Sequence, residues 1–186
     1  MSNTKGLKRA GKTTPKTVNV RVRFLTPVQV EHLIATARKH GRHCDRDACL
    51  IGLAYRHGLR VSELCALQWD DVDMKAATIS VRRAKGGAPG LHPLPGADLR
   101  ALRRLERSGS PWVLTTERGG PMTPAGVRDT LRRLGVLAGL GRVHPHMLRH
   151  ACGYKLVNQG TDIRLVQSYL GHRSIASTVR YTEVDA

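Results

Sequence analysis

Apolar residues recur at helical spacing along most of this chain. A helix is expected to begin at Thr26-Pro27, because threonine is a good cap and proline suits the first helical position. Its apolar face then consists of Val30, Leu33, Ile34 and Ala37. The same reasoning predicts further helices over about residues 46–57, 62–69, 97–107, 124–138, 146–158, 162–170 and 175–180.

Two short segments have the composition of strands instead. Thr78–Val81 is predicted to pair with Leu91–Leu94 as a hairpin, because the glycines and Pro89 between them favour a turn. Residues 112–114 are expected to be extended, and Trp69 and Trp112 are expected to be core anchors rather than platforms for stacked bases. The fold class predicted is therefore mainly α with a small antiparallel β-sheet (α+β).

The charge of the chain points to a polyanionic partner. The sequence contains 31 Lys plus Arg against 14 Asp plus Glu, a formal net charge of +17, and nucleic acid is the usual partner of such a protein. A solubility device or a ribosomal-type RNA-coating protein would show the same charge. Residues 1–25 are predicted to be a disordered basic leader, either an arm along DNA phosphates or a solvated tail. Residues 26–186 then form one domain.

The sequence also indicates where the protein works. No apolar run near the start suits a secretory signal, and none elsewhere suits a membrane span, so a cytoplasmic protein is expected. The four cysteines lack the C-x-x-C spacing of a zinc site and are predicted to be reduced thiols. Aromatic residues make up only 4% of the chain, which favours a largely helical core of aliphatic side chains.

A candidate phosphate site lies in one predicted helix. His146 and Arg149 are three residues apart, so both project from one face, and an arginine fork matches two phosphate oxygens. His150, one turn after His146, raises a competing zinc site. The H-E-x-x-H pattern of zinc proteases has a glutamate where this chain has Met147, and Arg149 would add positive charge beside the metal, so zinc is disfavoured.

Other candidate residues are weak when each is taken alone. Arg60 could be a second phosphate fork or a surface arginine at a helix end. Glu63 could hold the Arg60 guanidinium, or it could be an acid favoured by the helix dipole. Lys85 could be an ordinary turn lysine, and Tyr181 could simply be packed.

Five strings, however, occur together in a set order: Gly58-Leu59-Arg60-Val61-Ser62-Glu63-Leu64, Ala84-Lys85-Gly86, His146-Met147-Leu148-Arg149-His150, Leu170-Gly171-His172-Arg173-Ser174-Ile175 and Val179-Arg180-Tyr181-Thr182. In this order they resemble the tyrosine recombinases, the phage integrase family, and the resemblance covers residues 26–182. The stretches His144–Tyr154 and Tyr169–Arg173 are most similar to the small fimbrial phase-variation recombinases.

The resemblance implies a catalytic domain and a set of roles. Tyr181 would attack a DNA phosphodiester, releasing a 5′-hydroxyl and leaving a 3′-phosphotyrosyl ester. The residues expected around the phosphate are Arg60, Lys85, His146, Arg149 and His172, with Glu63 and His150 behind them. Lys85 can protonate the leaving oxygen, and His146 is the candidate base for Tyr181. Neither a cofactor nor a metal is expected, because the ester conserves the energy of the broken bond.

The resemblance also implies partners. The partner would be double-stranded DNA with short inverted-repeat sites, bound by a homo-oligomer, expected to be a tetramer, with accessory DNA-bending proteins possible and no membrane. Residues 1–25 are too few for the separate DNA-clamping domain of most relatives. Only Thr182–Ala186 follow the tyrosine, so weak association away from DNA is expected. A non-catalytic DNA-binding regulator and a relaxing topoisomerase are the alternative functions, and inversion, integration and excision stay open.

Overall fold

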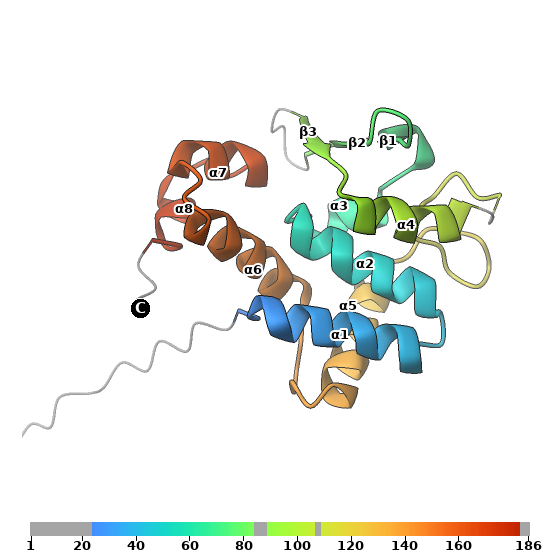
Figure 1. The fold of residues 1–186 in the computed structure, drawn as a ribbon. Coiled ribbons are helices and arrows are strands. Elements are labelled where there is room, and N and C mark those ends of the chain that lie inside the picture. Colours follow the sequence, from blue (N-terminus) through green and yellow to red (C-terminus); the bar gives the residue numbers. More distant parts are fainter. Residues whose placement is uncertain (1–23, 84–88, 107–108, 183–186) are drawn as a thin grey trace, which may run out of the picture.

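A capping side chain sets the start of the first helix. The hydroxyl of Thr26 accepts a hydrogen bond from the main-chain N–H of Gln29 (3.2 Å), whose side chain accepts one from the main chain of Thr26 (2.9 Å). A computed structural model of the chain describes residues 24–83, 89–106 and 109–182 (Figure 1). Its helices are α1 (Pro27–His40), α2 (Cys44–Arg56), α3 (Val61–Cys65), the 3₁₀ turn η1 (Trp69–Asp71), α4 (Gly96–Leu105), α5 (Pro124–Leu137), α6 (Pro145–Asn158), α7 (Ile163–Leu170) and α8 (Ala176–Val179).

Helix α2 is the centre of the fold. Every residue from Asp47 to Tyr55 is buried, as expected of a helix surrounded by other elements. It packs against α1, α4 and α6, and Figure 1 shows α1 and α4 on either side of it. The buried carboxylate of Asp47 bonds to Arg46 at 2.7 Å, so its charge is paired.

A small sheet lies beside the helices. Strands β1 (Val72–Asp73), β2 (Thr78–Val81) and β3 (Gly90–Pro93) form an antiparallel sheet in the order β1-β2-β3. Ile79 pairs with Val72 on one side and with His92 on the other. Inward and outward residues alternate along β2, and the alternation continues past its end, so that Arg82 is exposed and Arg83 is buried.

The apolar interior is divided into two clusters. The larger cluster contains residues from helices α1, α2, α3, α4 and α5, from the sheet and from the first half of α6. The smaller one belongs to the C-terminal end of the chain and consists of Cys152, Tyr154, Val166, Leu170 and Tyr181. In Figure 1, α7 and α8 lie at one end of the molecule, and α6 runs from there toward α1 and α2.

The fold class predicted from the sequence is confirmed, with two local corrections. The third helix ends at Cys65 rather than near Trp69, and a separate 3₁₀ turn follows it. The leader does not extend to residue 25: Leu25 is buried in the larger cluster, and the Phe24 ring lies 4.0 Å from that of Tyr154. Leu25 is buried and Phe24 is partly buried, and this apolar packing holds the chain ahead of α1.

Some expectations fall on residues that the structure does not describe. The basic leader over residues 1–23 and the turn at Gly86-Gly87 lie outside the described residues. All four cysteines are free in the structure, and Cys49 and Cys152 are buried. None of the described helices is both long and apolar enough to cross a membrane.

Candidate active site

Five of the six residues that the sequence singled out as catalytic line one hollow. It is bounded by the start of α3, the first turns of α6 and the segments on both sides of α8. The side chains lining this active-site hollow are Arg60, His146, Arg149, His150, His172, Ser177, Arg180 and Tyr181. Lys85, the sixth residue, lies outside the described part of the chain.

Arg149 is held from behind by main-chain oxygens. It is 4% exposed, and its guanidinium donates to the carbonyl of Gly58 and to that of Leu170, the latter at 2.6 Å. Burial and the nearby charge of Arg60 lower its pKa to about 10, so it stays positive at neutral pH. Because these carbonyl partners carry no net charge, they do not neutralise the guanidinium, and it can still attract a bound anion.

Arg60 is the cap of α3 and is fixed by Glu63. Its main-chain N–H donates to Glu63 Oε2 at 2.8 Å and its Nη1 to Glu63 Oε1 at 2.9 Å. The carboxylate of Glu63 therefore caps the start of α3 and orients the guanidinium of Arg60. Burial would raise the pKa of Glu63, but the bonds from Arg60 and the charge of Arg83 hold that pKa below its ordinary value.

The pKa of each histidine in the hollow is lowered by burial and by neighbouring cations, which favours the neutral ring. Burial and the charges of Arg149 and Arg60 lower the pKa of His172 to about 4. Nδ1 of His172 lies 2.9 Å from the hydroxyl of Thr178. With Thr178 donating to Nδ1, the other ring nitrogen carries the proton and can donate to a phosphate oxygen.

Tyr181 is buried at the edge of this group. Only 2% of it is exposed, and its ring meets Tyr154 edge-on at 4.9 Å and stacks toward His172 at 6.2 Å. Gly153 makes room for the ring, because a Cβ there would lie 2.5 Å from it. Burial raises the pKa of the Tyr181 phenol although Arg149 and Arg180 act to lower it, so the hydroxyl needs a base to lose its proton.

The neighbour of the phenol is not the residue that the sequence suggested. Nδ1 of His150 lies 3.1 Å from the Tyr181 hydroxyl, whereas His146 is exposed one turn earlier in α6. Burial and the charge of Arg180 lower the pKa of His150 to about 4, which favours the neutral ring. In the tautomer with its proton on Nε2, Nδ1 can accept the hydrogen bond of the phenol. The contact expected of His146 is thus made by His150, because Tyr181 lies against the later turns of α6, beside Gly153 and Tyr154.

Several residues that line or support the active-site hollow were not identified from the sequence. Arg83, Gly153, Thr178 and Arg180 all touch the residues of the hollow or their supports. For Arg83 a signal existed: the period-2 alternation of Ile79 and Val81 continues inward to it. Among the described residues, no group of three His, Cys, Asp or Glu side chains is placed to hold a metal.

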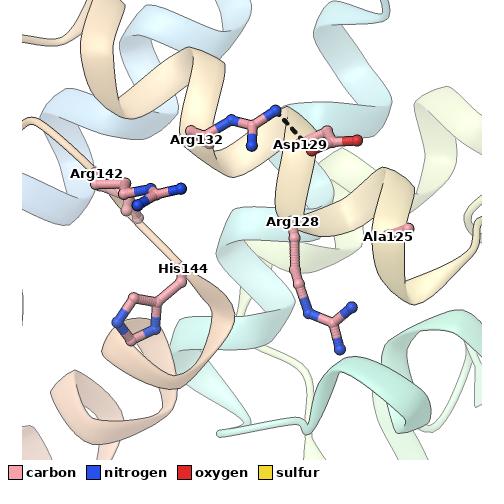
Figure 2. A pocket seen from close by; sticks show the side chains of 7 residues that line it. Ala125, Arg128, Asp129, Arg132, Arg142 and His144 are labelled. Atoms are coloured by element: carbon pink, nitrogen blue, oxygen red, sulfur yellow. Dashed lines mark ion pairs between the residues drawn. The ribbon is translucent and has the colours of Figure 1, made fainter.

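A second cationic hollow lies between α5 and the segment that leads into α6 (Figure 2). This flanking hollow is lined by Arg128, Arg132, Arg142 and His144, with Asp129 paired to Arg132 at 2.8 Å. Figure 2 shows Arg128 extending away from that ion pair. The charge of Arg128 contributes to lowering the pKa of His146, after burial and the charges of Arg149 and Arg60.

Comparison with known proteins places this geometry in context. Residues 23–186 match the model of the Phage integrase family. The chain is 40% identical over 173 residues to the type 1 fimbriae regulatory protein FimE of Escherichia coli K12, covering 88% of this chain and 87% of that protein.

Two solved structures share the fold. The crystal structure of XerA recombinase superposes with a TM-score of 0.78 at 28% identity, covering 87% of this chain and 60% of that one. XerH site-specific recombinase bound to its difH substrate, in a pre-cleavage complex, gives a TM-score of 0.76 at 25% identity, covering 88% of this chain and 51% of that one. This chain therefore spans between half and two thirds of either solved chain.

Proposed function

Since the chain belongs to the phage integrase family of tyrosine recombinases, we propose that it is a site-specific DNA recombinase in which Tyr181 is the nucleophile. The observation that carries this proposal is the Tyr181 hydroxyl, in contact with His150 inside a hollow that Arg60, Arg149 and His172 also line. The enzyme cuts a DNA strand, holds it as a 3′-phosphotyrosyl ester and rejoins it to another 5′ end.

In the cleavage step the phenol oxygen of Tyr181 forms a bond to phosphorus while the bond from phosphorus to O5′ breaks. The phenolic proton passes to Nδ1 of His150, which lies within hydrogen-bond distance. A proton must also reach O5′, and Lys85 is the proposed donor. In the rejoining step a 5′-hydroxyl attacks the ester and the same protons return, so no outside energy source is required.

Charge builds up on the phosphate oxygens as phosphorus becomes five-coordinate. Arg60 and Arg149 are suited to stabilise that charge, because both stay positive and both are already oriented by bonds to the protein. Each guanidinium has five N–H groups. The side chain of Arg60 uses two of them, to Glu63 and to the carbonyl of Gly171, and that of Arg149 uses two, to the carbonyls of Gly58 and Leu170. The others can meet the non-bridging oxygens, with His172 and His146 adding further hydrogen bonds.

The DNA itself extends beyond the active-site hollow. We place a neighbouring backbone phosphate in the flanking hollow, where Arg128 and Arg142 have no acidic partner among the described residues. Such contacts position DNA without reading its sequence. The protein would then act in the cytoplasm at the nucleoid, as a tetramer on paired sites with short inverted repeats, with or without DNA-bending proteins. Residues 26–186 would be its catalytic domain.

A second function is favoured by one observation: FimE is named a regulatory protein. This chain could bind DNA as a regulator on the same scaffold without cutting it. The deciding experiment offers the protein a nicked suicide substrate, whose cut end diffuses away and traps the ester. We expect a covalent adduct that peptide mapping assigns to Tyr181.

The matched variant is Tyr181→Phe, which keeps the ring and removes only the nucleophile. It should bind the same DNA with unchanged affinity and form no adduct. An adduct formed by Tyr181→Phe would exclude Tyr181 as nucleophile, and a parent protein that binds its site without forming any adduct would support the regulator.

A further inference from the structure

We propose that Arg83 is a positioning residue for the two catalytic arginines, and that the carboxyl end of α7 is where all three are fixed. The inference rests on the proposed function, because it concerns how Arg60 and Arg149 are held for the reaction. Arg83 does not line the active-site hollow, so it acts through its neighbours.

Three successive main-chain oxygens at the end of α7 each accept from a different arginine. We call the oxygens of Tyr169, Leu170 and Gly171 the α7 carbonyl row. Arg83 donates to the first, Arg149 to the second at 2.6 Å and Arg60 to the third at 3.0 Å. The three arginines come from separate parts of the chain: the segment just after β2, the second turn of α6 and the cap of α3.

The electrostatics of a helix end explain the arrangement. The last carbonyls of a helix have no N–H of the next turn to bond and carry partial negative charge. The oxygens of Gln167 and Ser168 are satisfied by the N–H groups of His172 and Gly171. The α7 carbonyl row lies beyond that reach and is satisfied by guanidinium groups instead, which fixes their positions relative to one another and to His172.

Arg83 supports this arrangement of arginines from the interior of the protein. Its side chain is fully buried, and Nη1 donates to Glu63 Oε2 at 3.2 Å while Nη2 lies 3.2 Å from Nε2 of His92. Glu63 is the same carboxylate that orients Arg60. Arg83 therefore secures Arg60 from two sides, through its carboxylate partner and through the helix end to which Arg60 donates.

The burial of Arg83 lowers the stability of the fold in one respect, which indicates a role other than stabilisation. Its Nε has no hydrogen-bond partner among the described residues, and an unsatisfied buried N–H lowers the free energy of unfolding. The backbone of Gly171 lies directly against the side chain, since a Cβ at Gly171 would be 2.8 Å from Arg83 Cδ. That contact couples the position of Arg83 to the residue immediately before His172.

The test compares two substrates that differ at the scissile phosphate. One carries the natural phosphodiester, and the other a methylphosphonate, in which a neutral methyl group replaces one charged oxygen. If Arg83 acts by placing Arg60 and Arg149, its loss should matter most where there is charge to stabilise. A residue that only stabilises the fold would slow both substrates equally, because it changes the amount of active protein.

The variants are Arg83→Met and the milder Arg83→Lys, with Arg82→Met as the matched control. Arg82 is the adjacent arginine, 65% exposed in its side chain and paired with Asp71 at 2.6 Å on the outside of the sheet. For Arg83→Met we expect single-turnover cleavage of the phosphodiester to fall about 100-fold, with DNA affinity unchanged and a much smaller loss on the methylphosphonate. Arg82→Met should match the parent on both.

Equal losses on the two substrates, or full activity of Arg83→Met, would overturn the inference while leaving the proposed function intact. If Arg83→Met does not fold, as judged by circular dichroism, Arg83→Lys decides, since it keeps the charge but cannot make all three contacts. A parent protein that forms no Tyr181 adduct would overturn the proposed function and this inference together.

Discussion

The hydroxyl of Tyr181 and Nδ1 of His150 lie 3.1 Å apart, within the active-site hollow and on a face of α6 that also holds Arg149. Because the phenol is buried and its pKa is raised, the tyrosine depends on a neighbouring acceptor to become a nucleophile. The pKa of His150 is lowered to about 4, which keeps that acceptor neutral at physiological pH.

Removing that acceptor should slow the chemical step without weakening DNA binding. We expect His150→Ala to form the tyrosyl adduct about 100-fold more slowly than the parent, in the range typical of a lost general base. The rate is measured in single-turnover reactions at saturating protein, and Tyr181→Phe provides the zero. If His150→Ala is as fast as the parent, His150 is not the general base, and His146 becomes the candidate.

Gly153 is predicted to be essential to the seating of Tyr181. An alanine in the interior of a helix normally gains about 1 kcal/mol over glycine, but here its methyl group would lie 2.5 Å from the ring, and overpacking of that kind costs about 1–3 kcal/mol. Gly153→Ala should therefore lower the melting temperature by several degrees and suppress adduct formation.

Gly126→Ala is the control for that substitution. Gly126 is also in a helix, α5, and a Cβ there meets only the Thr123 hydroxyl at 3.4 Å, an ordinary contact. This variant should be as stable as the parent or slightly more so. Equal melting temperatures for Gly153→Ala and the parent would contradict the packing argument.

The stability of the protein should fall as the pH is lowered from about 6.5 to 4. Folding lowers the pKa of both His150 and His172 from 6.5 to about 4. Between these values the unfolded chain binds protons that the folded chain does not, so acid favours unfolding in this window. The urea midpoint should decline from pH 7 to pH 4.5, and less steeply when both residues are replaced by glutamine. The exposed His40→Gln is the control, and an unchanged slope in the double variant would contradict the prediction.

DNA binding should depend steeply on salt, and part of that dependence should come from the flanking hollow. Each phosphate contact that is lost lowers the slope of log affinity against log salt by about 1. Replacing Arg128 and Arg142 together by glutamine should lower the slope by about 2, measured by fluorescence anisotropy across a salt series. Arg104→Gln, on α4 and in neither hollow, should leave the slope unchanged; a double variant with the parent's slope would exclude the flanking hollow from the DNA interface.

Much of the fold could be predicted because its signals are local. Thr26 and Pro27 mark the start of α1, and the alternation in Thr78–Val81 marks β2, so both elements lie where the sequence placed them. The partners of the catalytic side chains could not be predicted, since they depend on packing between elements. No local pattern tells that Tyr181 rests on Gly153, or that His150 rather than His146 meets its hydroxyl.

The support behind the active site was hidden for a similar reason. Arg60 and Glu63 are one turn apart, so their pairing was among the options that the sequence allowed. Arg83, which also bonds to Glu63, donates to a main-chain carbonyl of α7 that is far away in the sequence. Any residue type has such a carbonyl, so the sequence does not reveal which one accepts the bond. Phe24 was assigned to the leader because its neighbours are basic, although its ring packs against Tyr154.

The division of the interior into two unequal clusters has a consequence for motion. Segments with few buried apolar contacts open more readily than the rest of a domain, and Tyr181 belongs to the smaller cluster with Val166 and Leu170. Transient detachment of this end would carry the nucleophile outward while α2 and its surroundings stay folded. Because such opening would separate the Tyr181 hydroxyl from His150, the packing of the smaller cluster helps to keep the nucleophile beside the group proposed to accept its proton.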